Sequence, residues 1–208
     1  YDSEANCKCY IGTSSSGDDY GCSNTGDIRA TGAGGICGTY LNYQGEADLE
    51  ISYNTNSGEV GYGSSGSDGT SREVGGIIGS YGCYRQTSNS IVNIHLNGNS
   101  GAISSTGNGG ICGSYFAYGS TRKSSSNHYL PKISIKWCEN TGDIEAGQAG
   151  GICGSYAGRF YSNTSDQEGY LLIAYCSVTC GIKSGIMDSG GICGYRCGYR
   201  GSEGSTDY

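Results

Sequence analysis

The pentapeptide Gly34-Gly-Ile-Cys-Gly38 decides the fold, because it returns four more times along the chain. The later copies begin at Gly75, Gly109, Gly150 and Gly190, and the first of these has Ile in place of Cys. Spacings of about 34 to 41 residues between copies are typical of repeat architectures such as solenoids and propellers. We therefore interpret residues 1–208 as one repeat domain. Its repeated core isoleucines are Ile36, Ile77, Ile111, Ile152 and Ile192.

Three further elements recur around each pentapeptide. A turn-like segment, Asn24-Thr-Gly-Asp-Ile28 in the first copy, lies upstream. In four copies it follows alternating apolar residues such as Ile133, Ile135 and Trp137, and period-two alternation of β-branched and aromatic residues predicts a strand. A tyrosine follows each pentapeptide, one position earlier in the last copy. These residues are Tyr40, Tyr81, Tyr115, Tyr156 and Tyr195.

The repeat units must stack, because a unit with only two or three short strands cannot bury its own apolar stripe. We predict an all-β β-solenoid of five units, with Ile over Ile and a ladder of Tyr over Tyr. A β-propeller is the alternative, but each blade would need four regular strands. Residues 1–19 are predicted to form an atypical cap or arm, and the units to cover residues 20–44, 45–86, 87–127, 128–166 and 167–208.

With their preceding Asn-Thr-Gly-Asp-Ile elements, the Gly-Gly-Ile-Cys-Gly units resemble the GLUG-type glycine-rich repeats, whose core is usually written Gly-Gly-Leu-Val-Gly. The resemblance covers about residues 20–200, and this chain departs from it by placing Cys after Ile in four of the five copies. GLUG-type repeats occur in bacterial surface proteins and adhesins. The resemblance implies an extracellular surface protein and no particular activity.

The repeat register also predicts disulfide bonds. Cys138 and Cys153 lie 15 residues apart, as do Cys22 and Cys37 at the equivalent positions, and the second copy lacks both cysteines together. Because the two cysteines of a unit are present together or absent together, we expect them to bond to each other within the unit. Cys112 has no such partner, and Cys83 is the nearest unassigned candidate. The predicted bonds are Cys22–Cys37, Cys138–Cys153, Cys176–Cys193 and Cys83–Cys112.

Pairing of Cys7, Cys9, Cys180 and Cys197 cannot be deduced from the sequence. Four cysteines near the end, from Cys176 to Cys197, approach the spacing of a zinc ribbon. The repeat register already explains two of them, so we expect no metal site.

The composition indicates where the protein is located and which partners it can bind. Twelve cysteines among 208 residues favour an oxidising, extracellular setting. The net charge of −7 provides no basic cluster for nucleic acid. The longest apolar run, residues 170–176, is too short for a membrane-spanning helix of about 20 residues. The chain opens at Tyr1, without an apolar leader, and reads as a processed or excised segment.

Few residues suggest chemistry, and we expect neither an enzyme nor a cofactor. The two histidines, His95 and His128, lack a nucleophile context. A column of acidic residues, Asp27, Glu59 and Asp143, recurs once per unit as solvent-facing corner residues would. Oxygen-rich loops at residues 18–19 and 166–168 lack calcium-binding spacing. Asn163 is in the single glycosylation sequon.

Two functional interpretations remain open. The chain end has no amphipathic helix to cover the last unit, and an uncovered end invites a head-to-tail contact that continues into a filament. We therefore expect an extracellular structural protein whose partner is itself. The alternative is a monomeric adhesin-like module that binds glycans through tyrosines, or ice through a column of hydroxyls. That column is Thr25, Ser57, Ser100, Thr141 and Thr179.

Overall fold

The computed structural model describes residues 8–12, 20–43, 47–61, 73–86, 90–119, 132–145, 147–158, 170–183 and 188–198. These residues form twelve β-strands, all paired in parallel, and no helix. Consequently, no described helix is long and apolar enough to cross a membrane. The prediction of an all-β fold is confirmed.

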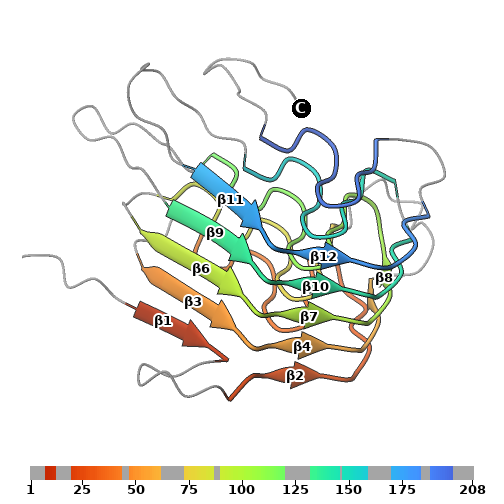
Figure 1. The fold of residues 1–208 in the computed structure, drawn as a ribbon, viewed down its shortest axis with the longest axis horizontal. Helices are drawn as coiled ribbons and strands as arrows, with labels where there is room; N and C mark the ends of the chain where they lie inside the picture. Colours follow the sequence, from red (N-terminus) through yellow and green to blue (C-terminus); the bar gives the residue numbers. More distant parts are fainter. Residues whose placement is uncertain are drawn as a thin grey trace, which may run out of the picture.

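The largest sheet holds the long strand of each repeat, in the order β1-β3-β6-β9-β11 (Figure 1). Each strand lies beside the equivalent strand of the next repeat, so that Ile94 pairs with Ile51 on one side and Ile135 on the other. We number the structural units one to five by these strands. Their bounds are β1 (Lys8–Ile11), β3 (Asp48–Ser52), β6 (Ile91–His95), β9 (Lys132–Lys136) and β11 (Tyr170–Ala174).

A second sheet, in the order β12-β10-β7-β4-β2, contains the first two-residue strand that follows each long strand. Its strands are β2 (Ser23–Asn24), β4 (Thr55–Asn56), β7 (Gly98–Asn99), β10 (Glu139–Asn140) and β12 (Ser177–Val178). A third pairing joins β5 (Val60–Gly61) to β8 (Ile103–Ser104), and single bridges extend it to Ile28, Ile144 and Ile182. Parallel stacking of equivalent segments is compatible with a β-solenoid.

The first unit starts earlier than the sequence predicts. β1 lies within residues 1–19, which we expected to form a cap or arm, but it pairs in register with β3. Ile11 occupies the position that Ile51 holds in the next unit. The alternation was missed because Cys9 and Ile11 are the only apolar inward positions of this short strand.

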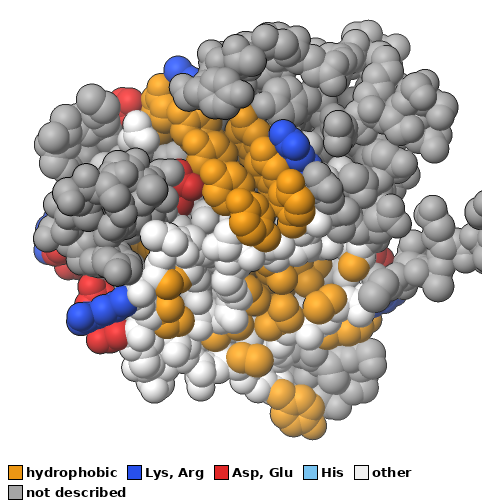
Figure 2. Space-filling view, turned by 180° about the vertical axis from the view of Figure 1, so that it is seen from behind, with side chains coloured by type: hydrophobic (Ala, Val, Ile, Leu, Met, Phe, Trp, Pro, Cys, Tyr) orange, Lys and Arg blue, Asp and Glu red, His pale blue; other side chains and the backbone are white. Residues whose placement is uncertain are grey.

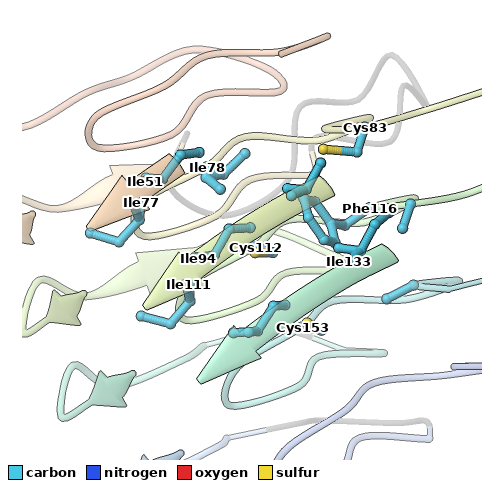
Figure 3. Packing of buried hydrophobic residues seen from close by; sticks show 14 of the residues in the cluster. Ile51, Ile77, Ile78, Cys83, Ile94, Ile111, Cys112, Phe116, Ile133 and Cys153 are labelled. Carbon is cyan, nitrogen blue, oxygen red and sulfur yellow. The ribbon is translucent and has the colours of Figure 1, made fainter. Parts of the chain in front are cut away.

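The core lies between the long strands and the pentapeptides (Figure 3). From the long strands, Ile51, Ile94 and Ile135 are fully buried, as are Ile77 and Ile111 from the pentapeptides. A second, smaller cluster contains Val60, Ile103 and Ile144, the apolar residues that end the upstream turn segments. Each isoleucine therefore packs against its own unit and both neighbours.

Candidate assembly surface

Among the described residues, the fifth unit is the last of the stack, and its core positions are more exposed than those of the inner units. Ile77, Ile111 and Ile152 are 0% exposed, whereas the equivalent Ile192 is 38% exposed. Leu171, Ile173 and Ile182 of the same unit are also only partly buried. β11 and β12 are the outermost strands of their sheets at this end. This end thus presents apolar side chains beside two strand edges.

A column of glycines shows how closely one unit approaches the next. A Cβ added at Gly110 would lie 2.2 Å from the carbonyl oxygen of Gly151, and one added at Gly151 would lie 2.1 Å from that of Gly191. Neighbouring backbones at these positions therefore leave no room for a side chain. At Gly191, a Cβ would meet nothing within 4 Å. Gly191 therefore lacks the close neighbouring backbone that Gly110 and Gly151 have.

The first unit forms the opposite end of the stack. β1 and β2 are the outermost strands there. Ile11, Ile28 and Ile36 are partly buried, although their equivalents in the second unit, Ile51, Val60 and Ile77, are fully buried. These three residues occupy the same repeat positions as Ile173, Ile182 and Ile192 at the other end.

The tyrosines that follow the pentapeptides form a stacked ladder. Ring centroids are 4.8 Å apart for Tyr81 and Tyr115, and 4.9 Å apart for Tyr115 and Tyr156, with nearly parallel planes. Tyr40 extends the ladder at 5.2 Å from Tyr81, and Tyr195 meets Tyr156 edge-on. Figure 2 shows hydrophobic side chains, a class that includes tyrosine, gathered in a band on the face hidden in Figure 1.

The ladder backbone adopts an unusual conformation. Tyr81, Tyr115 and Tyr156 have φ between 55° and 57°, the left-handed region that costs a non-glycine residue about 1 kcal/mol or more. Ring stacking of about 0.5–1.5 kcal/mol per pair offsets part of this cost. Burial, with a smaller contribution from the Glu73 carboxylate, raises the pKa of Tyr81 to about 12.

The structure contains a second tyrosine ladder, which the sequence analysis did not predict. Tyr43, Tyr84 and Tyr118 stack at 5.5 and 5.3 Å, and each meets a ring of the first ladder edge-on. The signal was a tyrosine three residues after Tyr40, Tyr81 and Tyr115. At the C-terminal end, the guanidinium of Arg196 lies 4.9 Å from the Tyr195 ring centroid.

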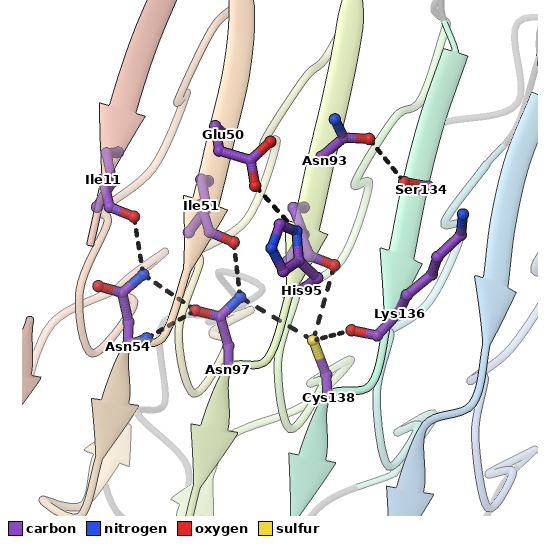
Figure 4. A network of polar contacts seen from close by, with 11 residues as sticks. Ile11, Glu50, Ile51, Asn54, Asn93, His95, Asn97, Ser134, Lys136 and Cys138 are labelled. Carbon is purple, nitrogen blue, oxygen red and sulfur yellow. Dashed lines mark hydrogen bonds and ion pairs between the residues drawn. The ribbon is translucent and has the colours of Figure 1, made fainter. Parts of the chain in front are cut away.

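An asparagine ladder lies at the corner between the two larger sheets (Figure 4). Asn54 Nδ2 donates to Asn97 Oδ1 at 3.0 Å, and Asn97 Nδ2 donates to the backbone oxygen of Ile51 at 2.9 Å. A parallel column continues through three buried amides, with Asn56 donating to Asn99 at 2.8 Å and Asn99 to Asn140 at 2.7 Å. These bonds satisfy amides that would be costly to bury alone.

The predicted disulfide bonds are not formed. The structure contains no disulfide among the cysteines that it describes, so Cys22–Cys37, Cys83–Cys112, Cys138–Cys153 and Cys176–Cys193 are all unbonded. The close thiol contacts run elsewhere, between Cys138 and Cys176, Cys112 and Cys153, and Cys193 and Cys197. The physical reason for the first two contacts is that stacking brings equivalent residues of neighbouring units together, whereas the predicted partners lie on different segments of one unit.

The four cysteines with near zinc-ribbon spacing do not gather. Cys176, Cys193 and Cys197 pack against the main core, while Cys180 packs against the smaller cluster and accepts a hydrogen bond from Asn140 at 3.1 Å. In the described part of the chain, no group of three or more His, Cys, Asp and Glu residues could hold a metal ion.

The acidic column binds backbone and lysine. Asp27 and Asp143 accept hydrogen bonds from the backbone of Glu59 and Gly181, each at 3.0 Å. Lys183 forms ion pairs with Asp143 at 3.4 Å and Glu145 at 3.0 Å. The Gly181 hydrogen bond, reinforced by Lys183, lowers the pKa of the exposed Asp143 carboxyl. These contacts tie neighbouring units together at the surface.

The hydroxyl column is exposed on the second sheet. Three of its members donate back to the preceding unit, since Ser57, Ser100 and Thr141 lie 3.4 to 3.5 Å from backbone oxygens of Asn24, Asn56 and Asn99. His95 lies on the outer face of β6, where its Nδ1 is 2.9 Å from Glu50 Oε1 (Figure 4). His128, Asn163 and the loops at 18–19 and 166–168 lie outside the described residues.

No family model matches this chain, and no curated protein or solved structure does so either.

Proposed function

We propose that this chain is an extracellular β-solenoid that assembles head to tail into a filament. The observation that carries the proposal is the uncovered fifth unit, where Ile192 is 38% exposed at a position fully buried in the three preceding units. Exposed strand edges and apolar side chains together favour pairing with another strand layer. The resemblance to GLUG-type repeats and the cysteine content support the extracellular setting.

The occupant that best fits this end is the first unit of another copy. Placed there, Ile11, Ile28 and Ile36 would continue the columns that end at Ile173, Ile182 and Ile192. β1 and β2 would pair with β11 and β12, as each unit already pairs with the next. The contact joins two different surfaces, so every docked copy leaves a free end, and such a heterologous contact grows without closing.

Gly191 offers a direct test by electron microscopy across a concentration series. Gly191→Ala places a methyl group where nothing lies within 4 Å in the single chain but where the next copy's Gly35 would approach. We expect filaments from the unchanged protein, and a folded monomer from the variant. The matched control is Gly98→Ala, on the outward side of β7, where an added Cβ also meets nothing within 4 Å.

The control should still assemble. Loss of filaments in both variants, or in neither, would contradict end-to-end stacking at Gly191. Failure of the unchanged protein to assemble at any concentration would refute the filament itself.

The exposed tyrosines favour a second candidate function. Tyr40 is 54% exposed and Tyr43 is 40% exposed at the start of the paired ladders, and flat aromatic rings are suitable platforms for sugar rings. A monomeric adhesin-like module would bind glycans there. Glycan-array binding that is lost in Tyr40→Ala, with the circular dichroism spectrum unchanged, would support this candidate over the filament.

A further inference from the structure

Cys138 and Cys176 occupy the same position in neighbouring units. They directly precede β10 and β12, whose residues Glu139 and Ser177 pair in register, and Ser177 N donates to Cys138 O at 3.0 Å. Paired parallel strands lie about 4.8 Å apart. That spacing is within the range of about 4.4–6.8 Å between Cα atoms that a disulfide bond spans. The two thiols already contact each other through a hydrogen bond.

Cys112 and Cys153 repeat this arrangement one unit earlier. They are bridge partners, and Gly154 N donates to Cys112 O at 3.0 Å. Both side chains are fully buried and joined by a thiol hydrogen bond. On its other side, Cys153 is a bridge partner of Cys193, but the Cys193 thiol is hydrogen-bonded to Cys197.

We propose that oxidation forms two disulfide bonds between units, Cys138–Cys176 and Cys112–Cys153. These two bonds link the third, fourth and fifth units in series. This pairing differs from the within-unit pairing that the sequence predicts. It depends on contacts inside one chain and is independent of the proposed filament.

Cys176 is the thiol that would react first. It is half-buried, whereas Cys138 is 1% exposed. The hydrogen bond from Cys138 lowers the pKa of Cys176 and so favours the thiolate form, which is the nucleophile in thiol–disulfide exchange.

A small-molecule disulfide such as oxidised glutathione would serve as the oxidant. The Cys176 thiolate attacks one of its sulfurs, forming a mixed disulfide and releasing one glutathione thiolate. Cys138 then loses its proton and attacks the Cys176 sulfur, which releases the second glutathione. The two cysteines lose two electrons in total, and glutathione disulfide gains them.

Peptide mapping of the full chain distinguishes the two pairings. The protein is oxidised with glutathione disulfide and digested without reduction by trypsin and a glutamate-specific protease, which separates residues 137–139, 146–159 and 169–183. We expect 137–139 linked to 169–183, and residues 86–122, which carry Cys112, linked to 146–159. Linkage of 137–139 to 146–159, or recovery of 137–139 unlinked, would overturn the proposal.

Matched serine variants identify the partner within residues 169–183, which also contain Cys180. Cys176→Ser should leave Cys138 reactive toward iodoacetamide in the oxidised, unfolded protein. Cys180→Ser should leave the Cys138 linkage intact, because Cys180 lies against the smaller core cluster. The opposite pattern would assign Cys138 to Cys180 and refute the between-unit pair at Cys176.

Discussion

The third and fifth units share the pentapeptide Gly-Gly-Ile-Cys-Gly but differ in their surroundings. In the third unit Ile111 is 0% exposed, and a Cβ at Gly110 would collide with the next backbone. In the fifth unit Ile192 is 38% exposed, and a Cβ at Gly191 would meet nothing. The same pentapeptide is therefore buried only where a further unit packs against it on each side, as in the third unit.

The largest difference between the two units is expected at the glycines. Gly110→Ala brings a methyl group within 2.2 Å of the Gly151 carbonyl oxygen and within 2.4 Å of the buried Asn140 side chain, which is held by its own hydrogen bonds. We expect a loss of roughly 4 kcal/mol or more in the free energy of unfolding. Gly191→Ala should change the stability of the single chain by less than about 1 kcal/mol. Urea denaturation at low protein concentration measures both, and equal losses would contradict the comparison.

Truncation of the isoleucines should give the next largest effect. Ile111→Ala empties space at a fully buried site and is expected to cost about 4 kcal/mol. Ile192→Ala removes a partly exposed side chain and is expected to cost less than about 2 kcal/mol. Thermal unfolding of the two variants under identical conditions tests the difference. A larger cost at Ile192 would mean that the last unit is covered in solution.

The asparagine ladder allows an inner unit to be compared with the first unit, with smaller expected losses in the free energy of unfolding. Asn99→Ala removes one of the two acceptors of Asn56 Nδ2 and the donor to Asn140 Oδ1, both in buried positions, and should cost about 2 kcal/mol. Asn24→Ala removes one donor at the partly exposed first unit and should cost about 1 kcal/mol or less. Chemical denaturation of both variants measures these costs. Similar values would indicate that the ladder is no stronger inside the stack than at its end.

Alkaline pH should weaken the tyrosine ladder, with the smallest effect of the four. The pKa of Tyr81 is about 12 in the folded protein and about 10 in an unfolded chain, so the folded state holds its proton more tightly. This contribution is complete below pH 10 and is lost as pH rises to about 12. Tyr81→Phe should flatten the fall of the melting temperature over that interval. An unchanged fall would locate the alkaline sensitivity elsewhere.

The repeat made most of the fold predictable. Alternation at Ile133 and Ile135 predicts a strand, and recurrence of the pentapeptide implies that equivalent strands stack, because no unit can bury its own isoleucine. The β1 strand was missed, since one short strand with Cys9 and Ile11 carries too little alternation. The second tyrosine ladder could also have been predicted, because its tyrosines lie three residues after those of the first ladder.

The cysteine contacts were not predictable from co-occurrence within units. Cys138 and Cys153 appear together because both positions face the same core, not because they contact each other most closely. Stacking distance decides the nearest thiol, and for Cys138 that thiol belongs to Cys176 of the next unit. A search for cysteines one full repeat apart would have found this pair.

Stacking of equivalent residues also limits the speed of folding. Asparagines that bond across units lie 32 to 43 residues apart in a chain of 208, a separation of about 0.15 to 0.2 of the chain length. Such values belong to proteins that fold in milliseconds to seconds. The sequence separation of each contact is set by the length of one unit and not by the number of units. A longer array would therefore meet the same loop-closure cost at every step, and folding could spread from any adjacent pair of units.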